Sequence, residues 1–275
     1  MKTFTYNDIK VPKLGLGTWQ NKEEDCKRAV KAALDMGYRH IDTAQAYDNE
    51  EHVGQGISES SVPREDVFVT TKIWRDKVAK DKLKPSLEES LKKLNTDYVD
   101  LVLLHWPVES VPLDEQLEAL EDVQRKGMAR LIGVSNYPVS HMKAVRETHN
   151  VDIATNQVEY HPFLSQEEVL NYIRANNMFL TAYSPLARGE VFENKTLFNI
   201  GEKHNLNAAQ VAVLWEYQQD NVVTNPKSDN PDHIQDNLNA IEQTLSKEEM
   251  KKISELQSPE GRLIDPDFAP QWDAA

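Results

Sequence analysis

The sequence predicts a single (β/α)8 TIM barrel that spans residues 1–275, with an N-terminal β-hairpin cap. The length of 275 residues suits either one α/β barrel or two smaller domains. Eight short apolar segments alternate with amphipathic helical segments along the chain. Several of the apolar segments, such as 99–104, are almost continuous, which is typical of parallel strands buried on both faces. Eight such units in a chain of this length fit a closed barrel better than an open sheet.

The elements follow one another in a regular order. Two short segments, 4–6 and 11–14, flank Asn7 and Asp8 and predict a small hairpin that caps one end of the barrel. The expected barrel strands are 14–17, 39–42, 67–72, 99–105, 131–135, 153–158, 179–184 and 222–224. The expected helices begin near residues 22, 49, 84, 113, 138, 165, 194, 208 and 231, and a last helix runs from 246 to 256.

An open, doubly wound sheet is the alternative fold. Its dinucleotide fingerprint needs three glycines in the first strand-to-helix turn, but the segment Gly15-Leu16-Gly17-Thr18-Trp19-Gln20 has only two. No low-complexity linker or short repeat interrupts the chain, so we expect one domain.

The composition excludes several classes of function. A formal charge of -14 argues against a nucleic-acid or anionic-membrane surface, because binding many phosphates needs a basic patch. No apolar run approaches the roughly 18 residues that would span a bilayer, and the first residues have no signal-peptide core, so we expect a cytoplasmic enzyme. The single cysteine, Cys26, excludes an internal disulfide framework and a cysteine-based zinc site.

Polar side chains end most of the expected strands. In a barrel the carboxyl ends of all strands lie on one face, so these side chains would converge on one pocket. Each residue alone also has an ordinary explanation, such as a solvated lysine or a core histidine, but their coincidence points to a site. The residues are Asp42, Lys72, His105, Ser135 with Asn136, Gln157, and Tyr183 with Ser184.

Tyr47, five residues beyond Asp42, adds a phenol to this set. A tyrosine near an aspartate is more often a structural hydrogen bond than a catalytic pair. With a lysine and a histidine, however, the group could transfer a proton to a developing alkoxide. Tyrosine titrates near 10, so acid chemistry at pH 7 asks for a shift of about three units, or roughly 4 kcal/mol. The Lys72 ammonium could supply a shift of that order, with Asp42 keeping it charged and His105 orienting a substrate carbonyl.

The chain resembles the aldo-keto reductase family over nearly its whole length. The matching segments keep the family's order and are Gly15-Leu16-Gly17-Thr18, Gly37-Tyr38-Arg39-His40-Ile41-Asp42-Thr43-Ala44, Tyr47, Thr71-Lys72-Ile73-Trp74, Asp97-Tyr98-Val99-Asp100-Leu101, His105-Trp106-Pro107, Gly133-Val134-Ser135-Asn136, Asn156-Gln157, Tyr183-Ser184-Pro185-Leu186 and Pro226-Lys227-Ser228. The compact length and the C-terminal segment are similar to the prokaryotic 2,5-diketo-D-gluconate reductase branch, B type, and to methylglyoxal reductases.

The resemblance implies an NADPH-dependent enzyme that reduces small aldehydes, α-dicarbonyls or keto-sugar acids, with Tyr47 as proton donor in a tetrad with Asp42, Lys72 and His105. It implies that the cofactor contacts Thr18, Asp42, Ser135, Asn136, Gln157, Tyr183, Ser184, Leu186, Lys227, Ser228, His233 and Asn237. At His233 the family usually has an arginine. A histidine is mostly neutral at pH 7, so we expect NADPH to be preferred by a narrower margin, with NADH also used.

Three tryptophans, Trp19, Trp74 and Trp106, follow expected strand ends and predict an apolar wall for the substrate, beside Tyr47 and His105. The tail that carries Trp272 either folds over this pocket as a further substrate contact or docks elsewhere on the barrel. A monomer is the family default. Two alternatives remain: a non-catalytic NADP-binding subunit on the same fold, and a metal-dependent hydrolase. No His-x-His pair ends the first strands, so we expect no metal site.

Overall fold

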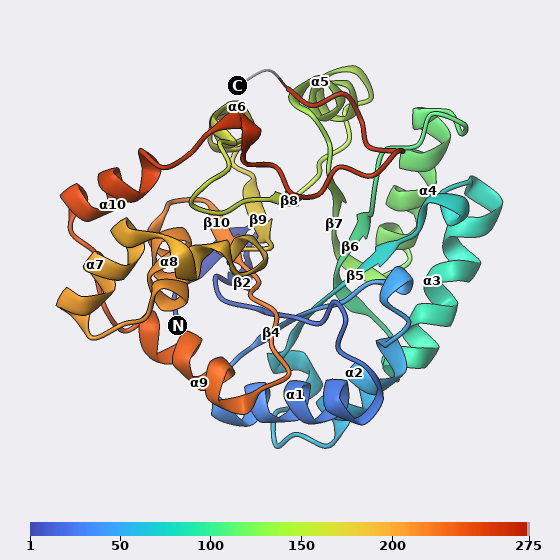
Figure 1. Cartoon of the computed structure of the whole chain (residues 1–275). Coiled ribbons are helices and arrows are strands. Elements are labelled where there is room, and N and C mark those ends of the chain that lie inside the picture. The colour runs from blue at the N-terminus through green and yellow to red at the C-terminus, as the bar shows by residue number, and fades with distance from the viewer. Residues whose placement is uncertain (274–275) are drawn as a thin grey trace.

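A ring of eight parallel strands forms the centre of the computed structural model, which describes residues 1–273 (Figure 1). The last two residues of the expected domain, 274–275, lie outside the described residues. The strands are β3 (Leu16–Gly17), β4 (His40–Asp42), β5 (Phe68–Ile73), β6 (Val99–Leu104), β7 (Ala129–Ser135), β8 (Thr155–Glu159), β9 (Phe179–Tyr183) and β10 (Val222–Thr224). Each strand pairs with the next in chain order. Parallel bridges from Leu14 to Thr224 and from Gly17 to Lys227 join the first strand region to the last, which confirms the closed (β/α)8 barrel.

The N-terminal hairpin closes one end of this barrel, as expected. Its strands are β1 (Thr3–Tyr6) and β2 (Ile9–Pro12), and the turn residues Asn7 and Asp8 adopt φ values of 45° and 64°. Asparagine and aspartate tolerate this left-handed conformation better than other non-glycine residues. The buried side chains of Tyr6 and Val11 pack on inward-facing residues of β5 to β10, so the chemistry is confined to the opposite end.

Helices surround the strands (Figure 1). They are α1 (Glu23–Met36), α2 (Glu50–Ser58), α3 (Lys80–Leu94), α4 (Leu113–Arg125), α5 (Val139–Lys143), α6 (Glu167–Ala175), α7 (Lys195–His204), α8 (Ala208–Gln218), α9 (Pro231–Ala240) and α10 (Lys247–Ser254). A π-helical segment (Ala144–Thr148) extends α5. Helices α7 and α10 are additional to the βα repeat, and α7 packs on α8, which is buried on nearly every side.

Several element boundaries shift by one or two residues, and two elements differ more clearly from the sequence-based expectation. Helix α3 begins at Lys80 rather than near residue 84, because the carbonyl of Ala79 already accepts hydrogen bonds from Lys82 and Leu83. Pro85 therefore lies inside the helix instead of in its first turn. Tyr47 lies in a separate 3-10 turn between β4 and α2, η1 (Gln45–Tyr47), which Asp48 ends with a φ of 53° and which is absent from the expected elements.

No helix in residues 1–273 combines the length and the apolar composition that crossing a membrane requires.

Candidate active site

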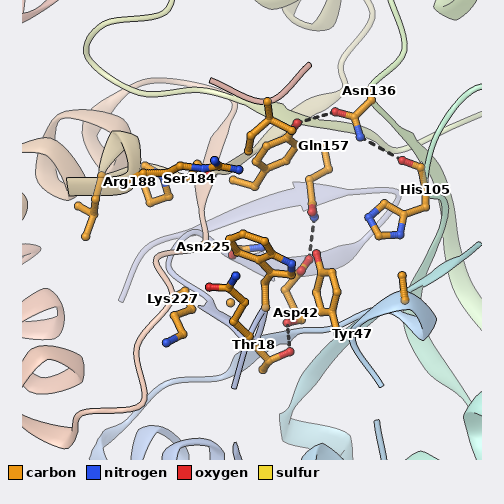
Figure 2. Close-up of a pocket in the computed structure, with 18 of the residues that line it drawn as sticks. Thr18, Asp42, Tyr47, His105, Asn136, Gln157, Ser184, Arg188, Asn225 and Lys227 are labelled. Atoms are coloured by element: carbon orange, nitrogen blue, oxygen red, sulfur yellow. Dashed lines mark hydrogen bonds between the residues drawn. The ribbon is translucent and has the colours of Figure 1, made fainter. Parts of the chain in front are cut away.

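A cavity of about 900 Å³ opens at the carboxyl ends of the strands (Figure 2). It is lined by most of the site residues expected from the sequence, which come from all eight strands of the barrel and the loops that follow them. These are Thr18, Trp19, Asp42, Tyr47, Trp74, His105, Trp106, Asn136, Gln157, Tyr183, Ser184, Leu186 and Lys227. Strand ends as far apart in sequence as Gly17 and Thr224 are thus brought to one mouth, as the barrel topology requires.

Lys72 lies beneath the cavity floor and is fully buried. Its Nζ donates to Asp42 Oδ1 at 2.5 Å, to the backbone carbonyl of Thr43 at 2.8 Å and to the Tyr47 hydroxyl at 3.3 Å. Residue 72 is the inward-facing position near the end of β5, beside β4, so the strand register itself brings the ammonium to Asp42. All three ammonium protons therefore have acceptors, and one acceptor is the phenol.

The charges of this group depend on a balance between burial and pairing. Burial alone would lower the pKa of Lys72, but the Asp42 carboxylate and the Tyr47 hydroxyl more than offset it, and the pKa is raised above its usual value. For Tyr47, burial outweighs the attraction of Lys72, and the pKa of the phenol is raised rather than lowered. The expectation that Lys72 brings this pKa down towards 7 in the free protein is therefore wrong, and Tyr47 stays protonated at neutral pH.

His105 stands at the end of β6, facing Tyr47 and Trp74 edge-on at ring-centroid distances of 5.8 and 5.1 Å. Its Nδ1 is buried without a hydrogen-bond partner among the described residues. Burial, reinforced by the Lys72 charge, lowers the pKa of the imidazole well below its usual value. His105 is therefore neutral at pH 7, and one of its ring nitrogens carries a proton that it can donate to a ligand.

A chain of amides forms the wall next to the acid group (Figure 2). Gln157 donates to Asp42 Oδ2 at 2.7 Å, so both carboxylate oxygens of Asp42 are engaged. Asn136 donates to the His105 carbonyl at 3.0 Å and accepts from the Tyr183 hydroxyl at 2.7 Å. Ser135 lies behind this wall, outside the cavity lining, where its hydroxyl donates to the Gln157 carbonyl at 2.8 Å.

The far end of the cavity lies between β9 and β10. Ser184 and Leu186 line one side and Lys227 the other, where its Nζ approaches Asp229 at 3.4 Å. Ser228, His233 and Asn237 do not line the cavity. Ser228 and Asn237 are largely buried beside it, whereas His233 is exposed on the first turn of α9.

Comparison with known proteins adds identity to this geometry. A model of the aldo/keto reductase family matches residues 13–258. The chain belongs to the aldo/keto reductase family. It is therefore an oxidoreductase that reduces carbonyl groups, and members of this family use a reduced nicotinamide dinucleotide, NAD(P)H.

Relatives and solved structures agree with this assignment. The reductase is 41% identical over 269 residues to methylglyoxal reductase DkgB of Escherichia coli O157:H7, covering 96% of this chain and 100% of the relative. It is 40% identical over 263 residues to glyoxal reductase of Bacillus subtilis (strain 168), covering 95% of each chain. A crystal structure assigned provisionally as a 2,5-diketo-D-gluconic acid reductase B superposes with a TM-score of 0.97 at 42% identity, over 100% of this chain and 98% of that one.

The cavity of the reductase fits a nicotinamide dinucleotide. Its volume lies near the upper end of the roughly 300–1,000 Å³ usual for small-molecule sites, which is more room than a small carbonyl compound needs. Both polar side-chain atoms of Asn225, on the cavity wall, are buried without a partner among residues 1–273. The lining also offers two cations, Arg188 and Lys227, for phosphates, and the amides of Asn136 and Gln157 for a carboxamide.

The C-terminal tail of the reductase covers the aromatic side of the cavity. Ile264 lines the cavity, and Phe268 packs edge-on against Trp74 and Trp106 at 6.1 and 5.4 Å. The Trp272 ring lies behind Trp106, with 6.2 Å between the ring centroids, and the guanidinium carbon of Arg262 lies 3.6 Å from its centroid. Trp272 is not part of the cavity lining. The tail thus folds over the pocket, but Trp272, expected as a direct contact, only supports the wall.

Sequence reasoning missed several lining residues of the reductase, among them Ala46, Arg188, Asn225 and Ile264. Each is next to a recognised segment rather than in it: Arg188 follows Leu186, and Asn225 precedes Pro226. Only Asn225 offered a signal, because a polar residue directly after the apolar strand 222–224 is expected at the barrel mouth.

Among the described residues, no group of three or more His, Cys, Asp or Glu side chains is arranged to hold a metal ion.

Proposed function

We propose that this reductase converts small aldehydes, α-dicarbonyl compounds or keto-sugar acids into alcohols, with NADPH as the preferred cofactor and Tyr47 as the proton donor. The observation behind the proposal is the position of Tyr47, which lines the cavity. The buried Lys72 ammonium, which is paired with the Asp42 carboxylate, lies 3.3 Å from the Tyr47 hydroxyl. The relatives' names, methylglyoxal reductase and glyoxal reductase, favour small α-dicarbonyl compounds.

The substrate carbonyl would be held by two donors. The protonated Tyr47 hydroxyl and the neutral His105 imidazole face the same region of the cavity, and both can donate to one carbonyl oxygen. Trp19, Trp74 and Trp106 supply an apolar wall around it, which favours a small substrate and keeps water away from the reacting carbon.

Proton transfer would complete the reduction. A reduced nicotinamide held in the cavity would be the source of the hydride for the carbonyl carbon. As the oxygen becomes an alkoxide, it takes the proton of Tyr47, and the negative charge left on the phenolate is stabilised by Lys72. Asp42 keeps the ammonium charged and fixed, since its Oδ1 and Oδ2 are held by Lys72 and Gln157. Tyr47 regains its proton from solvent after the alcohol leaves.

The preference for NADPH would depend on Lys227, Ser228 and the N-terminus of α9. Asn230 caps this helix by accepting from the Asp232 backbone amide, with Pro231 in the first position. A 2′-phosphate near the helix end would meet the Lys227 ammonium, although Asp229 dilutes that charge. His233 cannot make the bidentate contact of an arginine, so NADH would also be used.

A panel of carbonyl compounds tests the proposal. Purified protein is assayed for oxidation of NADPH and of NADH with methylglyoxal, glyoxal, a diketo-gluconate and a simple aldehyde. We expect turnover with at least one α-dicarbonyl and a higher kcat/KM with NADPH. Tight NADPH binding with no turnover of any carbonyl would favour a cofactor-binding subunit instead.

We further propose that the enzyme acts as a cytoplasmic monomer. Sedimentation equilibrium of the purified protein should give the mass of one chain, and a dimer mass would overturn this part of the proposal.

A further inference from the structure

The turn that carries Tyr47 is weakly held by packing. None of the three residues of η1 is fully buried, and Ala46 is exposed. A second cavity, of about 320 Å³, lies on its outer side between the turn and α3, and Ala46 and Trp74 line both this space and the active-site cavity. Apolar burial of the outer side of the turn therefore contributes little to holding the turn in place.

Hydrogen bonds from the Gln45 side chain cross the gap between the turn and α3. The Gln45 amide nitrogen lies within hydrogen-bonding distance of the Ser86 hydroxyl at 2.6 Å, the Ser86 carbonyl at 3.1 Å and the Ser90 hydroxyl at 3.0 Å, and its two N–H groups are shared among these three acceptors. The Gln45 carbonyl oxygen accepts from the Trp74 backbone amide at 3.0 Å. One carboxamide thus ties the turn to α3 and to the end of β5.

The two segments joined in this way are those that carry the acid and its cation. Gln45 lies two residues before Tyr47, and Trp74 lies two residues after Lys72. Anchoring Gln45 to the Trp74 amide sets the distance between turn and strand, and so the 3.3 Å between Lys72 Nζ and the Tyr47 hydroxyl. At the other end of the turn, the Thr43 hydroxyl donates to the Asn49 amide oxygen at 2.7 Å.

We propose that Gln45 is a positioning residue for proton transfer, holding the Tyr47 phenol against Lys72 through Ser86, Ser90 and Trp74. This inference deepens the proposed function and rests on it for its kinetic consequence. Gln45 does not line the active-site cavity, so its effect is on the geometry of the acid rather than on cofactor or substrate contact.

The test is Gln45→Met, which keeps the length of the side chain and removes its donor and acceptor. A small displacement of a reacting group costs up to about 10²-fold in rate, so kcat should fall roughly ten- to a hundred-fold. The dissociation constant of NADPH, measured by quenching of tryptophan fluorescence, should stay within about twofold, and KM for the carbonyl should change little. Gln243→Met, on an exposed position, is the matched control and should behave as wild type.

The pH profile of kcat separates positioning from general destabilisation. Moving the phenol away from Lys72 raises its pKa, so the alkaline limb that reports the acid should shift upwards in Gln45→Met. The charged or titratable groups that face the phenol are Asp42, Lys72, His105 and Tyr183, and none is altered by the substitution.

A second variant acts from the other side of the gap. Ser86→Ala with Ser90→Ala removes the hydroxyl anchors on α3, and alanine is favoured within a helix, so folding should be retained. This pair should reproduce part of the loss in kcat, and adding Gln45→Met should lower kcat no further than Gln45→Met alone. Additive losses, or wild-type kcat and an unshifted pH limb in Gln45→Met, would overturn the proposal.

One readout does not need activity. In the free protein, amide hydrogen exchange at Trp74 and in residues 45–48 should speed up in Gln45→Met, and a crystal structure of the variant should show the Lys72–Tyr47 hydrogen bond lengthened or broken. If wild type reduced no carbonyl, the proposed function would fail, while unchanged exchange and distance would reject the role of Gln45 separately.

Discussion

Two fully buried ionisable side chains in this protein differ in charge, since Lys72 is charged and Glu216 is neutral. The presence or absence of hydrogen-bonding partners explains the difference. Lys72 is fully buried, yet the pKa of its ammonium is raised because Asp42 and Tyr47 more than offset the cost of burial. Glu216 in α8 is also fully buried, but neither carboxylate oxygen has a partner among residues 1–273. Burial therefore raises the pKa of Glu216 well above its usual value, and it is carried as a neutral acid.

At the residue scale, Lys72→Met should reduce kcat roughly 10²-fold or more, because the phenolate formed during reduction loses its cation. The pKa of Tyr47 should rise further, and the alkaline limb of the pH profile of kcat should therefore move to higher pH. The change also leaves Asp42 buried without its ion-pair partner, which costs about 3–5 kcal/mol of stability. Chemical denaturation and stopped-flow kinetics measure the two effects.

The matched control for this variant is Lys72→Met combined with Asp42→Asn. The double variant should recover much of the stability, because no unpaired charge remains, but not the activity. Recovery of kcat together with stability would mean that Lys72 acts only as a structural ion-pair partner.

The residues that could be predicted from sequence are those whose position follows from strand direction alone. Asp42, Lys72, His105 and Gln157 lie at or near the carboxyl ends of parallel strands, so one topological rule brings them together. Gln45 could not be found in this way, because its partners Ser86 and Ser90 lie 41 and 45 residues further along the chain. Nor could the net pKa of Tyr47, since the degree of burial decides its direction.

At the element scale, the N-terminus of α9 combines a side-chain cap, a proline and an exposed histidine. Its dipole favours an anion there, and the side chain of His233 is exposed on its first turn. The proposed binding of a 2′-phosphate at this segment would therefore be weaker than beside an arginine at residue 233.

His233→Arg should widen the preference for NADPH over NADH by tightening NADPH binding, with little change in kcat. One added charge-assisted contact at an exposed site is worth about 1 kcal/mol, or roughly fivefold in the ratio of kcat/KM values. Asn239→Arg, on the exposed face near the other end of α9, controls for the added charge. An unchanged ratio in His233→Arg would show that residue 233 does not face the phosphate.

Element types were predictable where hydrophobic periodicity is strong, and a residue that can cap a helix helps to place its first turn. Helix α9 begins at Pro231 as expected, because Asn230 is a cap that the sequence displays. Helix α3 begins earlier than expected, since Ala79 carries no side-chain cap and Pro85 falls within the helix. The 3-10 turn η1 left no periodic signal, because three residues are too few to show one.

At the scale of the whole molecule, closure of the barrel leaves none of its eight strands at a sheet edge. Helix α8 is packed between the barrel and its neighbouring helices. The alternation of strands and helices predicts this architecture, and the bridges from Leu14 and Gly17 to the last strand complete it. The path of the C-terminal tail could not be predicted, because it depends on contacts such as Phe268 with Trp106 that no local pattern specifies.

Buried Glu216 gives the whole barrel a stability that depends on pH. Its pKa is raised in the folded protein, so above about 4.3 the unfolded chain releases this proton while the folded protein retains it. The stability that the folded protein has with Glu216 protonated is fully present below the unfolded pKa of this carboxyl group. It is lost as pH rises towards the folded pKa, and the free energy of unfolding falls by up to about 1.4 kcal/mol per pH unit.

Glu216→Gln should therefore be more stable than wild type at neutral pH, with the difference in unfolding free energy growing from pH 5 to pH 8. Urea denaturation at several pH values measures it, and Glu202→Gln, on the exposed side of α7, controls for loss of one negative charge. A difference that stayed constant over this range would mean that Glu216 ionises in the folded protein.

The central claim, that Tyr47 donates the proton, is tested most directly by a single-turnover experiment with Tyr47→Phe. The variant is loaded with NADPH, mixed with excess methylglyoxal, and the loss of NADPH absorbance is followed by stopped flow. The phenyl ring remains, so the dissociation constant of NADPH should be nearly unchanged, while the single-turnover rate should fall roughly 10²- to 10⁴-fold. A wild-type rate of NADPH oxidation in Tyr47→Phe would contradict the account.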